Sequence, residues 1–252
     1  MRVVSWNMSG RKSDDAWRHL LDVLRPDVAL LQEAAVSDTM RAELGGRLIW
    51  QPISNVKWGS AIVTTTPATH VEVELSTEWM DYVRLVATDA VVDSKSLRII
   101  SVHPHHMAFD EELLPEHPEL TPRLDGARSV WSCDVAYALA RDLTAAAPAF
   151  VVGGDWNTAR LFDRTMGYLE PGAGEAFFAR ANADGWHDCY HARHGREGRT
   201  WIRGKDNGYQ LDHVFTDGVT GEAVKDCWID ERAAVDPRLS DHAPLIVDFE
   251  AS

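Results

Sequence analysis

The sequence predicts an α/β protein in which two packed β-sheets lie between outer layers of helices. Short apolar runs of strand character recur along its 252 residues, and a few stretches of helical periodicity interrupt them. This alternation is typical of two sheets whose outer faces are covered by helices. Three of the apolar runs end on a polar residue, which indicates chemistry at one edge of a sheet.

Hydrophobic periodicity gives the expected elements. Apolar spacing predicts a helix at 14–25, another at 129–144, and a short helix within the loop at 158–183. The four residues from Asp93 to Ser96 indicate a hairpin that joins two strands. Strands are expected at 2–6, 28–32, 47–51, 60–65, 69–75, 82–92, 97–103, 149–153, 199–203, 210–216, 224–230 and 244–249.

Length and composition indicate one globular domain. The 252 residues are 45% hydrophobic, enough for a large core, and we expect residues 1–252 to form a single domain. The three cysteines are scattered without Cys-x-x-Cys spacing, so neither a disulfide framework nor a thiolate metal site is expected. The net charge of −14 disfavours binding of nucleic acid by a broad cationic surface, although a local groove remains compatible with it.

The sequence also carries expectations about location and assembly. It holds no apolar stretch long enough to cross a bilayer, so no membrane insertion is expected. Its first residues read directly as a strand rather than as a signal peptide. We therefore expect a cytoplasmic protein and a monomer.

The polar residues at the strand ends have metal-binding chemistry. Glu33 and Asp155 follow apolar runs, and Asp241 precedes one. Asn7 and Asn157 add neutral amide oxygens. Carboxylate and amide oxygens suit Mg²⁺ or Mn²⁺ better than Zn²⁺, so the sequence predicts a divalent-cation cofactor. The glycines before Asp155 are expected to let the backbone come close to a ligand.

Two Asp-His pairs suggest one shared polar site. Asp212 and His213 lie about thirty residues before Asp241 and His242, and each pair stands against a strand-like run. A buried Asp beside a His requires partners, so the two clusters are expected to meet. His213 alternates to the opposite strand face from Asp212 and is interpreted as structural. Trp156 is likewise expected to point into the core.

Six motifs in order resemble the endonuclease/exonuclease/phosphatase superfamily, which includes deoxyribonuclease I and exonuclease III-like repair nucleases. The similarity spans nearly the whole chain. The motifs are Trp6-Asn7, Gln32-Glu33, Ser101-Val102-His103, Gly154-Asp155-Trp156-Asn157, Leu211-Asp212-His213 and Ser240-Asp241-His242.

The resemblance implies a fold, an activity and a role for each motif. The fold would be the deoxyribonuclease I-like four-layer sandwich, with two mainly antiparallel sheets. Glu33 would be the principal metal ligand, with Asn7 and Asp241 close to the metal. The remaining motif residues would be catalytic. Asp155 would activate the attacking water, Asn157 would hold the phosphate or the metal shell, His242 would face the phosphate with Asp212 accepting its other N–H, and His103 would bind phosphate or protonate the leaving group.

Aromatic and cationic residues outside the motifs are candidates for substrate contact. The stretch from Arg193 to Lys205 carries five cations against a single acid, Glu197, and glycines separate them. We expect this stretch to form one wall of a substrate groove, with Trp201 as a flat surface for stacking. The substrate-binding candidates are Arg199, Trp201, Arg203 and Trp58.

His103 is expected to have an acidic partner nearby. Pairing of 82–92 with 97–103 would bring the start of the first strand next to the end of the second. Asp81 or Glu78 would then hold the His103 ring.

Other interpretations compete with the phosphoesterase. His103, His105 and His106, with Asp110 and His117, could form a zinc cluster. Gly153-Gly154-Asp155 is similar to calcineurin-like metallophosphatases, whose other motifs are missing. A catalytically silent binding protein on the same fold is the alternative of another class.

The sequence thus predicts a divalent-metal-dependent phosphoesterase that uses an activated water. Nucleic acid is the first expected substrate and partner, in an endonuclease or exonuclease reaction. A small phosphorylated metabolite or a lipid head group is the alternative, which the acidic composition keeps open.

Overall fold

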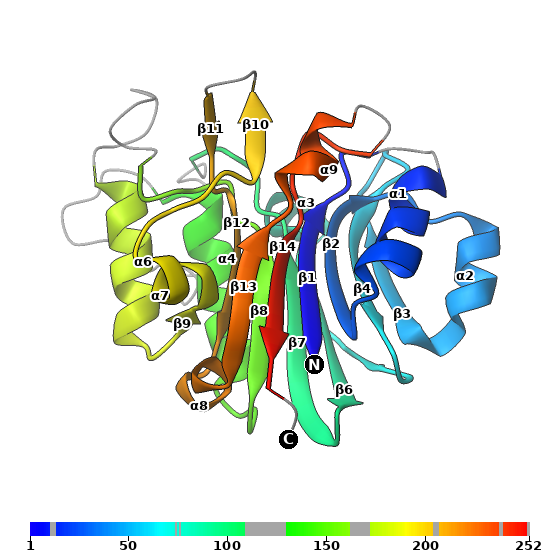
Figure 1. Cartoon of the computed structure of the whole chain (residues 1–252), viewed down its shortest axis with the longest axis horizontal. Coiled ribbons are helices and arrows are strands. Elements are labelled where there is room, and N and C mark those ends of the chain that lie inside the picture. Colours follow the sequence, from blue (N-terminus) through cyan, green and yellow to red (C-terminus); the bar gives the residue numbers. More distant parts are fainter. Residues whose placement is uncertain are drawn as a thin grey trace.

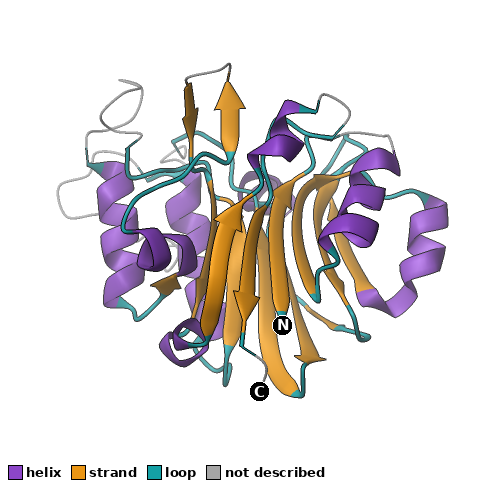
Figure 2. Cartoon of the chain, viewed as in Figure 1, coloured by secondary structure: helices purple, strands orange, loops and turns teal. Residues whose placement is uncertain are grey.

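Two six-stranded β-sheets form the centre of the described structure, and helices cover their outer faces (Figure 1). In this computed structural model the described residues are 1–10, 14–73, 75, 77–108, 130–161, 172–203, 207–236 and 239–250, with the backbone alone described at 77, 78, 203 and 207. The expected sandwich of two mainly antiparallel sheets is confirmed. Figure 2 shows the same layers, with helices on both sides of the strands.

Each sheet holds one parallel strand pair, and its other pairs are antiparallel. The first sheet has the order β13 (Val224–Ile229), β14 (Leu245–Phe249), β1 (Arg2–Asn7), β2 (Val28–Ala34), β4 (Gly59–Thr64), β3 (Leu48–Pro52). The second has the order β5 (Thr69–Val71), β6 (Val86–Val92), β7 (Lys95–Val102), β8 (Phe150–Asp155), β12 (Asp212–Thr216), β9 (His187–Asp188). A separate hairpin consists of β10 (Trp201–Arg203) and β11 (Asn207–Tyr209).

The helices lie outside the sheets or in the loops between strands. They are α1 (Asp14–Arg18) with the π-helical turn η1 (His19–Leu24), α2 (Asp38–Leu44) with the 3₁₀ turn η2 (Gly45–Arg47), α3 (Thr77–Val83), α4 (Ser132–Thr144), α6 (Ala173–Ala183), α7 (Cys189–His194), α8 (Gly218–Glu222) and α9 (Glu231–Val235).

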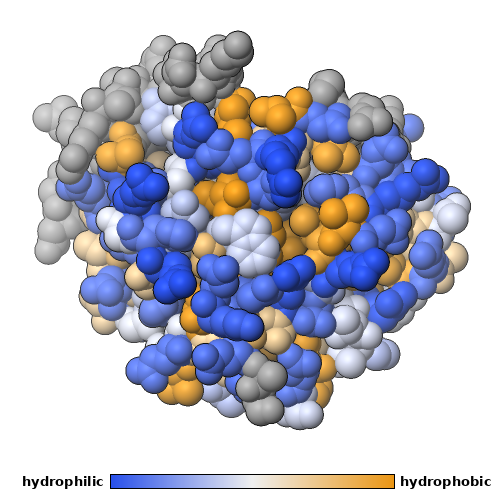
Figure 3. Space-filling view, in the orientation of Figure 1, coloured by the Kyte–Doolittle hydropathy of each residue, from blue (hydrophilic) through white to orange (hydrophobic). Residues whose placement is uncertain are grey.

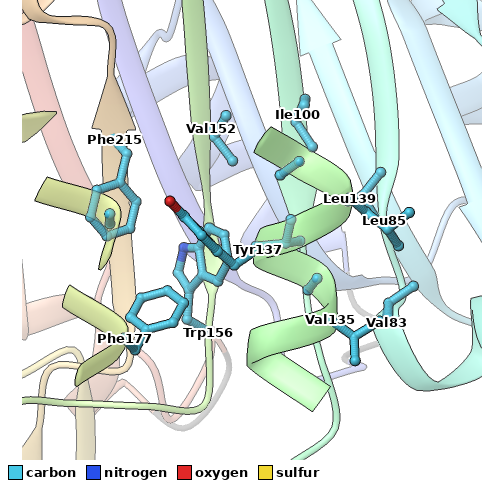
Figure 4. Packing of buried hydrophobic residues seen from close by; sticks show 14 of the residues in the cluster. Val83, Leu85, Ile100, Val135, Tyr137, Leu139, Val152, Trp156, Phe177 and Phe215 are labelled. Atoms are coloured by element: carbon cyan, nitrogen blue, oxygen red, sulfur yellow. The ribbon is translucent and has the colours of Figure 1, made fainter. Parts of the chain in front are cut away.

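Three apolar cores follow from the alternation of side chains along the strands. In β8, Val151 packs between the two sheets, whereas Val152 packs toward α4 and α6. In β2, Leu30 points between the sheets and Leu31 points toward α1. Both faces of the central strands are therefore buried, which explains why these strands read as continuous apolar runs. Figure 4 shows the core under α4.

One face of the molecule is seen in a space-filling view. The face in Figure 3 is largely hydrophilic, with apolar groups scattered between the polar ones. No helix among the described residues is long and apolar enough to cross a bilayer.

The two sheets match each other strand by strand. In each, the parallel pair occupies the two central positions, β1 with β2 in one sheet and β8 with β7 in the other. The strand on the far side of β1 is β14, and the strand on the far side of β8 is β12. The carboxyl ends of β1, β2, β7 and β8 therefore meet the amino ends of β12 and β14 at one shared edge.

Several elements differ from the sequence expectation. The predicted strand at 82–92 begins only at Val86, because Tyr82 and Val83 complete α3, whose Trp79 and Val83 pack in the core with α4. The predicted strand at 69–75 ends at Val71. Helices α2, α7, α8 and α9 were not predicted, because helices of five to seven residues are too short to show a full apolar repeat.

The glycines before Asp155 allow strands to approach one another. A Cβ at Gly154, whose φ is +151°, would lie 2.0 Å from the Val102 carbonyl oxygen in β7. A Cβ at Gly153 would lie 2.8 Å from the Leu30 side chain of the other sheet. Among the described residues, these glycines approach β7 and β2 closely, and this sets the spacing of the strand ends that carry the polar residues.

We predict that Gly154→Ala lowers the free energy of unfolding by more than about 2 kcal/mol, because the added Cβ collides with backbone. Urea denaturation of the two proteins measures this difference. Gly218→Ala is the matched control, since a Cβ there has no heavy atom within 4 Å. That control should change stability by no more than about 1 kcal/mol. Equal effects of the two substitutions would contradict the proposed strand contact.

Candidate active site

Polar side chains from both sheets gather at the shared edge. Asn7 ends β1 and Asp155 ends β8, and their side chains meet across the gap between the sheets. The Asn7 amide nitrogen donates to Asp155 Oδ2 at 2.9 Å and lies 3.5 Å from Glu33 Oε1. The Asn7 amide oxygen accepts from the Ser9 backbone N–H at 2.9 Å, which fixes this orientation of the amide. Asn7, Glu33 and Asp155 thus form one cluster.

Glu33 reaches the cluster through an irregularity in β2. The pairing of β2 with β4 shifts register between Leu31 and Ala34, and Glu33 adopts a left-handed conformation with φ of 48°. A non-glycine residue in this region marks local strain that the surroundings must hold. Backbone bonds hold it here, because Gly10 N–H donates to the Glu33 carbonyl and Met8 N–H donates to the Gln32 carbonyl. The bulge redirects the Glu33 carboxylate toward the strand ends.

The surroundings of the Glu33 and Asp155 carboxylates destabilise their charged forms. Burial raises the pKa of Glu33 above its ordinary value, although the Asn7 hydrogen bond opposes the shift. Burial also raises the pKa of Asp155, to about 6, against the opposing effect of His242. None of the described Lys or Arg side chains lies within 4.0 Å of either carboxylate. A cation at this position would therefore be favourable.

His103 follows β7 and is buried beside the two acids. Its Nε2 lies 3.7 Å from Glu33 Oε1 and 3.8 Å from Asp155 Oδ2. Burial lowers the pKa of His103 well below its usual range, so its ring is neutral at pH 7. Its Nδ1 is buried with no hydrogen-bond partner among the described residues.

The predicted contact of His103 with Asp81 is wrong. The Asp81 carboxylate accepts from the Ser54 backbone N–H at 3.2 Å, and Asp81 belongs to α3 rather than to a strand. The acids beside the His103 ring are Glu33 and Asp155 instead. The other candidate, Glu78, has a side chain outside the described set.

Asp212 and His242 form a buried pair that also joins the two sheets. Asp212 begins β12 and is fully buried, and its Oδ2 accepts from His242 Nδ1 at 2.8 Å. His242 Nε2 then faces Asp155 Oδ2 at 3.8 Å. Burial alone would lower the pKa of His242, but the Asp212 and Asp155 carboxylates raise it to about 9. The imidazole is therefore a cation at neutral pH, with its proton-bearing Nε2 directed at the site.

The backbone around His242 is firmly held. Ser240 Oγ donates to the Asn7 carbonyl at 2.6 Å and accepts from the His242 N–H at 3.0 Å. The Trp6 indole donates to the His242 carbonyl at 2.9 Å. The bonds anchor the segment before β14 to β1, so the position of the imidazole relative to Asn7 is fixed.

The other motif residues lie around this cluster. Asp241 is exposed, and its charge raises the pKa of both Glu33 and His242. The Asn157 backbone N–H donates to Asp155 Oδ1 at 3.0 Å, and its side chain donates to the Pro104 carbonyl at 2.9 Å. Asn157 therefore ties the loop after β8 to the segment that follows His103.

The residues interpreted as structural do lie away from the site. His213 is fully buried on the opposite face of β12, where its ring contacts Gln210 and the Thr158 carbonyl. Trp156 is fully buried and packs against Phe177 and Phe215 (Figure 4). Both predictions are confirmed.

Of the residues proposed to contact substrate, Trp58 and Trp201 lie beside the site. Trp58 is half-buried beside the site, with its ring centroid 6.1 Å from that of His103. Trp201 stacks on Tyr209 in the β10–β11 hairpin and forms a backbone bridge with His242, which places the hairpin at the site edge, at the top of Figure 1. The side chain of Arg203 lies outside the described set.

Arg199 is already ion-paired. Its Nη2 lies 2.6 Å from Glu231 Oε2 of α9, and Arg193 Nε lies 3.9 Å from Asp226. Acids outside this stretch therefore pair with two of its cations. Glu197 itself accepts from the backbone N–H groups of Arg160 and Leu161.

Sequence reasoning missed Arg84. Its guanidinium lies over the Trp58 ring, with Cζ 5.3 Å from the ring centroid, and its charge acts on Glu33, His103 and Asp155. No sequence pattern identified it, because it lies in the short connection between α3 and β6, which was predicted to be strand.

The donor set fits a hard divalent cation. Among the described residues, no group of three or more His, Cys, Asp or Glu side chains is arranged to hold a metal ion. Mg²⁺ characteristically binds through one or two carboxylates and keeps several waters, so Glu33 with a neighbouring carboxylate is a sufficient set. Asn7 presents its nitrogen, rather than its oxygen, to the two acids as the side chains stand.

The zinc alternative loses support in the described part of the chain. His105 Nε2 contacts Arg84 Nη2, and burial lowers the pKa of both His105 and His106. The other members of that cluster, Asp110 and His117, lie outside the described residues. A cation directly beside His105 makes that ring a poor metal ligand.

A two-sheet sandwich with an acid, amide and imidazole cluster at its joint edge is the architecture of a metal-assisted hydrolase. The chain belongs to the Endonuclease/Exonuclease/phosphatase family, whose model matches residues 4–242. Because members of this family hydrolyse phosphoric esters, the chain is a phosphoric ester hydrolase. Family members generally depend on a divalent metal.

Solved structures with this fold cover almost the whole chain. The 3′ phosphatase NExo from Neisseria, bound to a product DNA hairpin, has 21% sequence identity and a TM-score of 0.73, with 99% of each chain covered. An AP endonuclease from Archaeoglobus fulgidus has 16% identity and a TM-score of 0.69, again with 99% of each chain covered. A humanized D. rerio TDP2 has 14% identity and a TM-score of 0.59, with 99% of this chain and 98% of that chain covered. No curated protein sequence matches the chain significantly.

We predict that Asp212→Asn changes how stability depends on pH. The pKa of His242 in the folded protein, about 9, exceeds the value of about 6.5 in an unfolded chain. The folded state therefore holds the proton more tightly, so this stabilisation is complete below about pH 6.5 and is lost as the pH rises through 9. Urea denaturation in EDTA measures the free energy of unfolding at pH 6.5 and at pH 9. The decrease between these two pH values should be smaller in the Asp212→Asn variant than in the wild type.

Asp217→Asn is the matched control. Asp217 caps α8, and its side chain accepts from Thr220 N–H. Hydrogen bonds lower its pKa, so it affects the pH dependence of stability only at acid pH. This variant should keep the wild-type difference between pH 6.5 and pH 9. If Asp212→Asn loses as much stability as the wild type between pH 6.5 and pH 9, the proposed charge of His242 is contradicted.

Proposed function

We propose that this protein hydrolyses phosphate esters of nucleic acid with Mg²⁺ or Mn²⁺ and an activated water, and that residues 1–252 act as one domain. The observation that carries the proposal is the Asp155 carboxylate. It is buried, it bonds Asn7, and it lies 3.8 Å from the Nε2 atoms of both His103 and His242. Water activation beside a phosphate requires this combination of a base, a cationic imidazole and a neighbouring acid ligand.

Each side chain has a distinct task in this proposal. Asp155, with a pKa raised to about 6, is a stronger base than an ordinary carboxylate and takes the proton of the attacking water. His242, protonated and oriented by Asp212, donates to a non-bridging phosphate oxygen as negative charge develops there. Neutral His103, whose Nε2 lies 3.8 Å from Asp155 Oδ2, also binds the phosphate. Asn157 holds the loop that carries Pro104.

The metal is held by Glu33, with Asn7 and Asp241 near it. When bound, it supplies Lewis-acid polarisation of the phosphate and neutralises charge. Mg²⁺ and Mn²⁺ are supported by the carboxylate and amide oxygens of this donor set, which such hard cations prefer.

Nucleic acid is supported as the substrate by the family and by neighbours of the same fold. Those neighbours include a 3′ phosphatase bound to a product DNA hairpin and an AP endonuclease. Trp58, beside His103, and Trp201, bridged to His242, are proposed to stack on bases, and Arg199 and Arg203 are proposed to lie along the backbone path. A small phosphorylated metabolite is the second candidate, and it is favoured by the net charge of −14 and by the ion pair of Arg199 with Glu231.

We predict that turnover depends on a divalent metal. EDTA should abolish hydrolysis of bis(p-nitrophenyl) phosphate and DNA, and Mg²⁺ or Mn²⁺ should restore it, because the paired acids need a cation. Glu33→Gln should raise the metal concentration required for half-maximal rate by at least about tenfold. Rescue by Zn²⁺ alone would contradict the oxygen-ligand assignment. Absence of any metal-dependent turnover would favour a catalytically silent binding protein.

We also predict that Asp155→Asn and His242→Ala each lower kcat by at least about 100-fold, through loss of the base or of charge stabilisation. Steady-state kinetics on the same substrates measure both effects. His213→Ala is a useful comparison, because that histidine is buried on the other face of β12 and should affect stability more than kcat per folded molecule. Near wild-type turnover in either site variant would remove that residue from the mechanism.

A further inference from the structure

The backbone of Arg84 is held in a specific, strained position at the site edge. Arg84 follows α3 and adopts a left-handed conformation with φ of 44°. Its N–H donates to the Met80 carbonyl at 2.8 Å, which closes the end of the helix. Its carbonyl accepts from Ser60 Oγ at 2.6 Å and from the His103 N–H at 3.2 Å. The residue is thus attached to β4 and to the backbone of an active-site histidine.

The Arg84 side chain is also positioned. Nε donates to the Asp81 carbonyl at 3.1 Å, Nη2 contacts His105 Nε2, and the guanidinium lies over the Trp58 ring. Cation–π contact of this kind holds a guanidinium without consuming its donors. Half-burial of the side chain limits the alternative rotamers.

The charge of Arg84 has no direct acidic partner. None of the described carboxylate oxygens lies within 4.0 Å of its nitrogens, although its charge acts on Glu33 and Asp155 at longer range. Burial lowers the pKa of Arg84, which shows that water is partly removed from a group that stays charged. A partly desolvated cation with unused donors is suited to an anionic oxygen.

We propose that Arg84 is a substrate-binding residue that donates to the non-bridging oxygens of the phosphate, and that its charge makes the site favour a phosphomonoester over a phosphodiester. The inference rests on the proposed phosphoesterase function. It goes beyond that function by assigning a role to a residue outside the sequence motifs and by naming the charge type of the preferred substrate.

The preference follows from the charge of the ligand. A phosphomonoester carries two negative charges at pH 8, whereas a diester carries one, and Coulomb attraction to a fixed cation grows in proportion. The acids Glu33, Asp155 and Asp241 repel the dianion twice as strongly as the monoanion. Arg84 offsets this repulsion from its position next to Trp58, whose ring lies beside that of His103.

The test compares two substrates that share a leaving group. p-Nitrophenyl phosphate is the dianionic monoester, and bis(p-nitrophenyl) phosphate is the monoanionic diester. Arg84→Gln should lower kcat/KM on the monoester at least about tenfold more than on the diester, since one charge-assisted hydrogen bond is lost. Arg84→Lys keeps the charge and should retain the wild-type ratio between the two substrates.

Arg41→Gln is the matched control. Arg41 also lies over a tryptophan, with Cζ 4.9 Å from the Trp50 ring centroid, but it is exposed on α2. This variant should leave kcat/KM on both substrates unchanged. Two results would overturn the proposal: an equal loss of kcat/KM on both substrates in Arg84→Gln, or loss of the wild-type ratio of monoester to diester kcat/KM in Arg84→Lys. Either result would mean that Arg84 only supports the segments that carry Trp58 and His105.

A binding measurement separates this inference from the proposed function. Calorimetric titration with inorganic phosphate and with diethyl phosphate at pH 8, in the presence of Mg²⁺, requires no turnover. Weaker binding of inorganic phosphate by Arg84→Gln, with diethyl phosphate affected less, supports the role of Arg84 even if neither p-nitrophenyl substrate is hydrolysed. Failure of the wild type to hydrolyse any ester would instead overturn the proposed function. Equal affinities of wild type and Arg84→Gln for inorganic phosphate would overturn the role of Arg84.

Discussion

Hydrogen bonds that cross from one sheet to the other hold the site together. Asn7 of β1 donates to Asp155 of β8, Gln32 of β2 donates to Ser101 of β7 at 3.0 Å, and Asp212 of β12 accepts from His242 before β14. Each bond joins strands that occupy matching positions in the two sheets. Apolar packing between the sheets sets their separation, and these bonds set their register. Loss of one of these hydrogen bonds would leave a buried polar group without a partner. The geometry of the site and the packing of the sheets are therefore coupled.

The same arrangement separates the charge states of two histidines. His103 and His242 both lie within 4 Å of Asp155, yet the pKa of one is lowered and that of the other is raised. Burial and the charge of Arg84 lower the pKa of His103, whereas Asp212 pairs with His242 and, together with Asp155, raises its pKa. A neutral and a charged imidazole beside the same carboxylate can bind the same phosphate in different ways. Sites with neighbouring groups of diverging pKa values are typical of acid and base catalysis.

The sequence predicted the strand ends well and the contacts between distant loops poorly. Asn7, Glu33, Asp155 and Asp212 were identifiable because each borders an apolar run, and the sheet topology then brings them together. The bulge at Glu33 and the pairing of Arg199 with Glu231 depend on tertiary contacts that leave no local pattern. Arg84 was missed for the same reason, since α3, the segment that holds Trp58 and Ser60, and the segment that holds His103 and His105 together position it.

Crystallographic location of Mn²⁺ by anomalous scattering tests whether the cluster at the shared edge is a divalent-metal site for phosphoester hydrolysis. We expect a peak bonded to the Glu33 carboxylate, beside Asn7 and Asp155, with His242 unligated because it is protonated. A peak confined to the His103 to His106 segment, or no peak in crystals of protein that turns over substrate, would contradict this assignment.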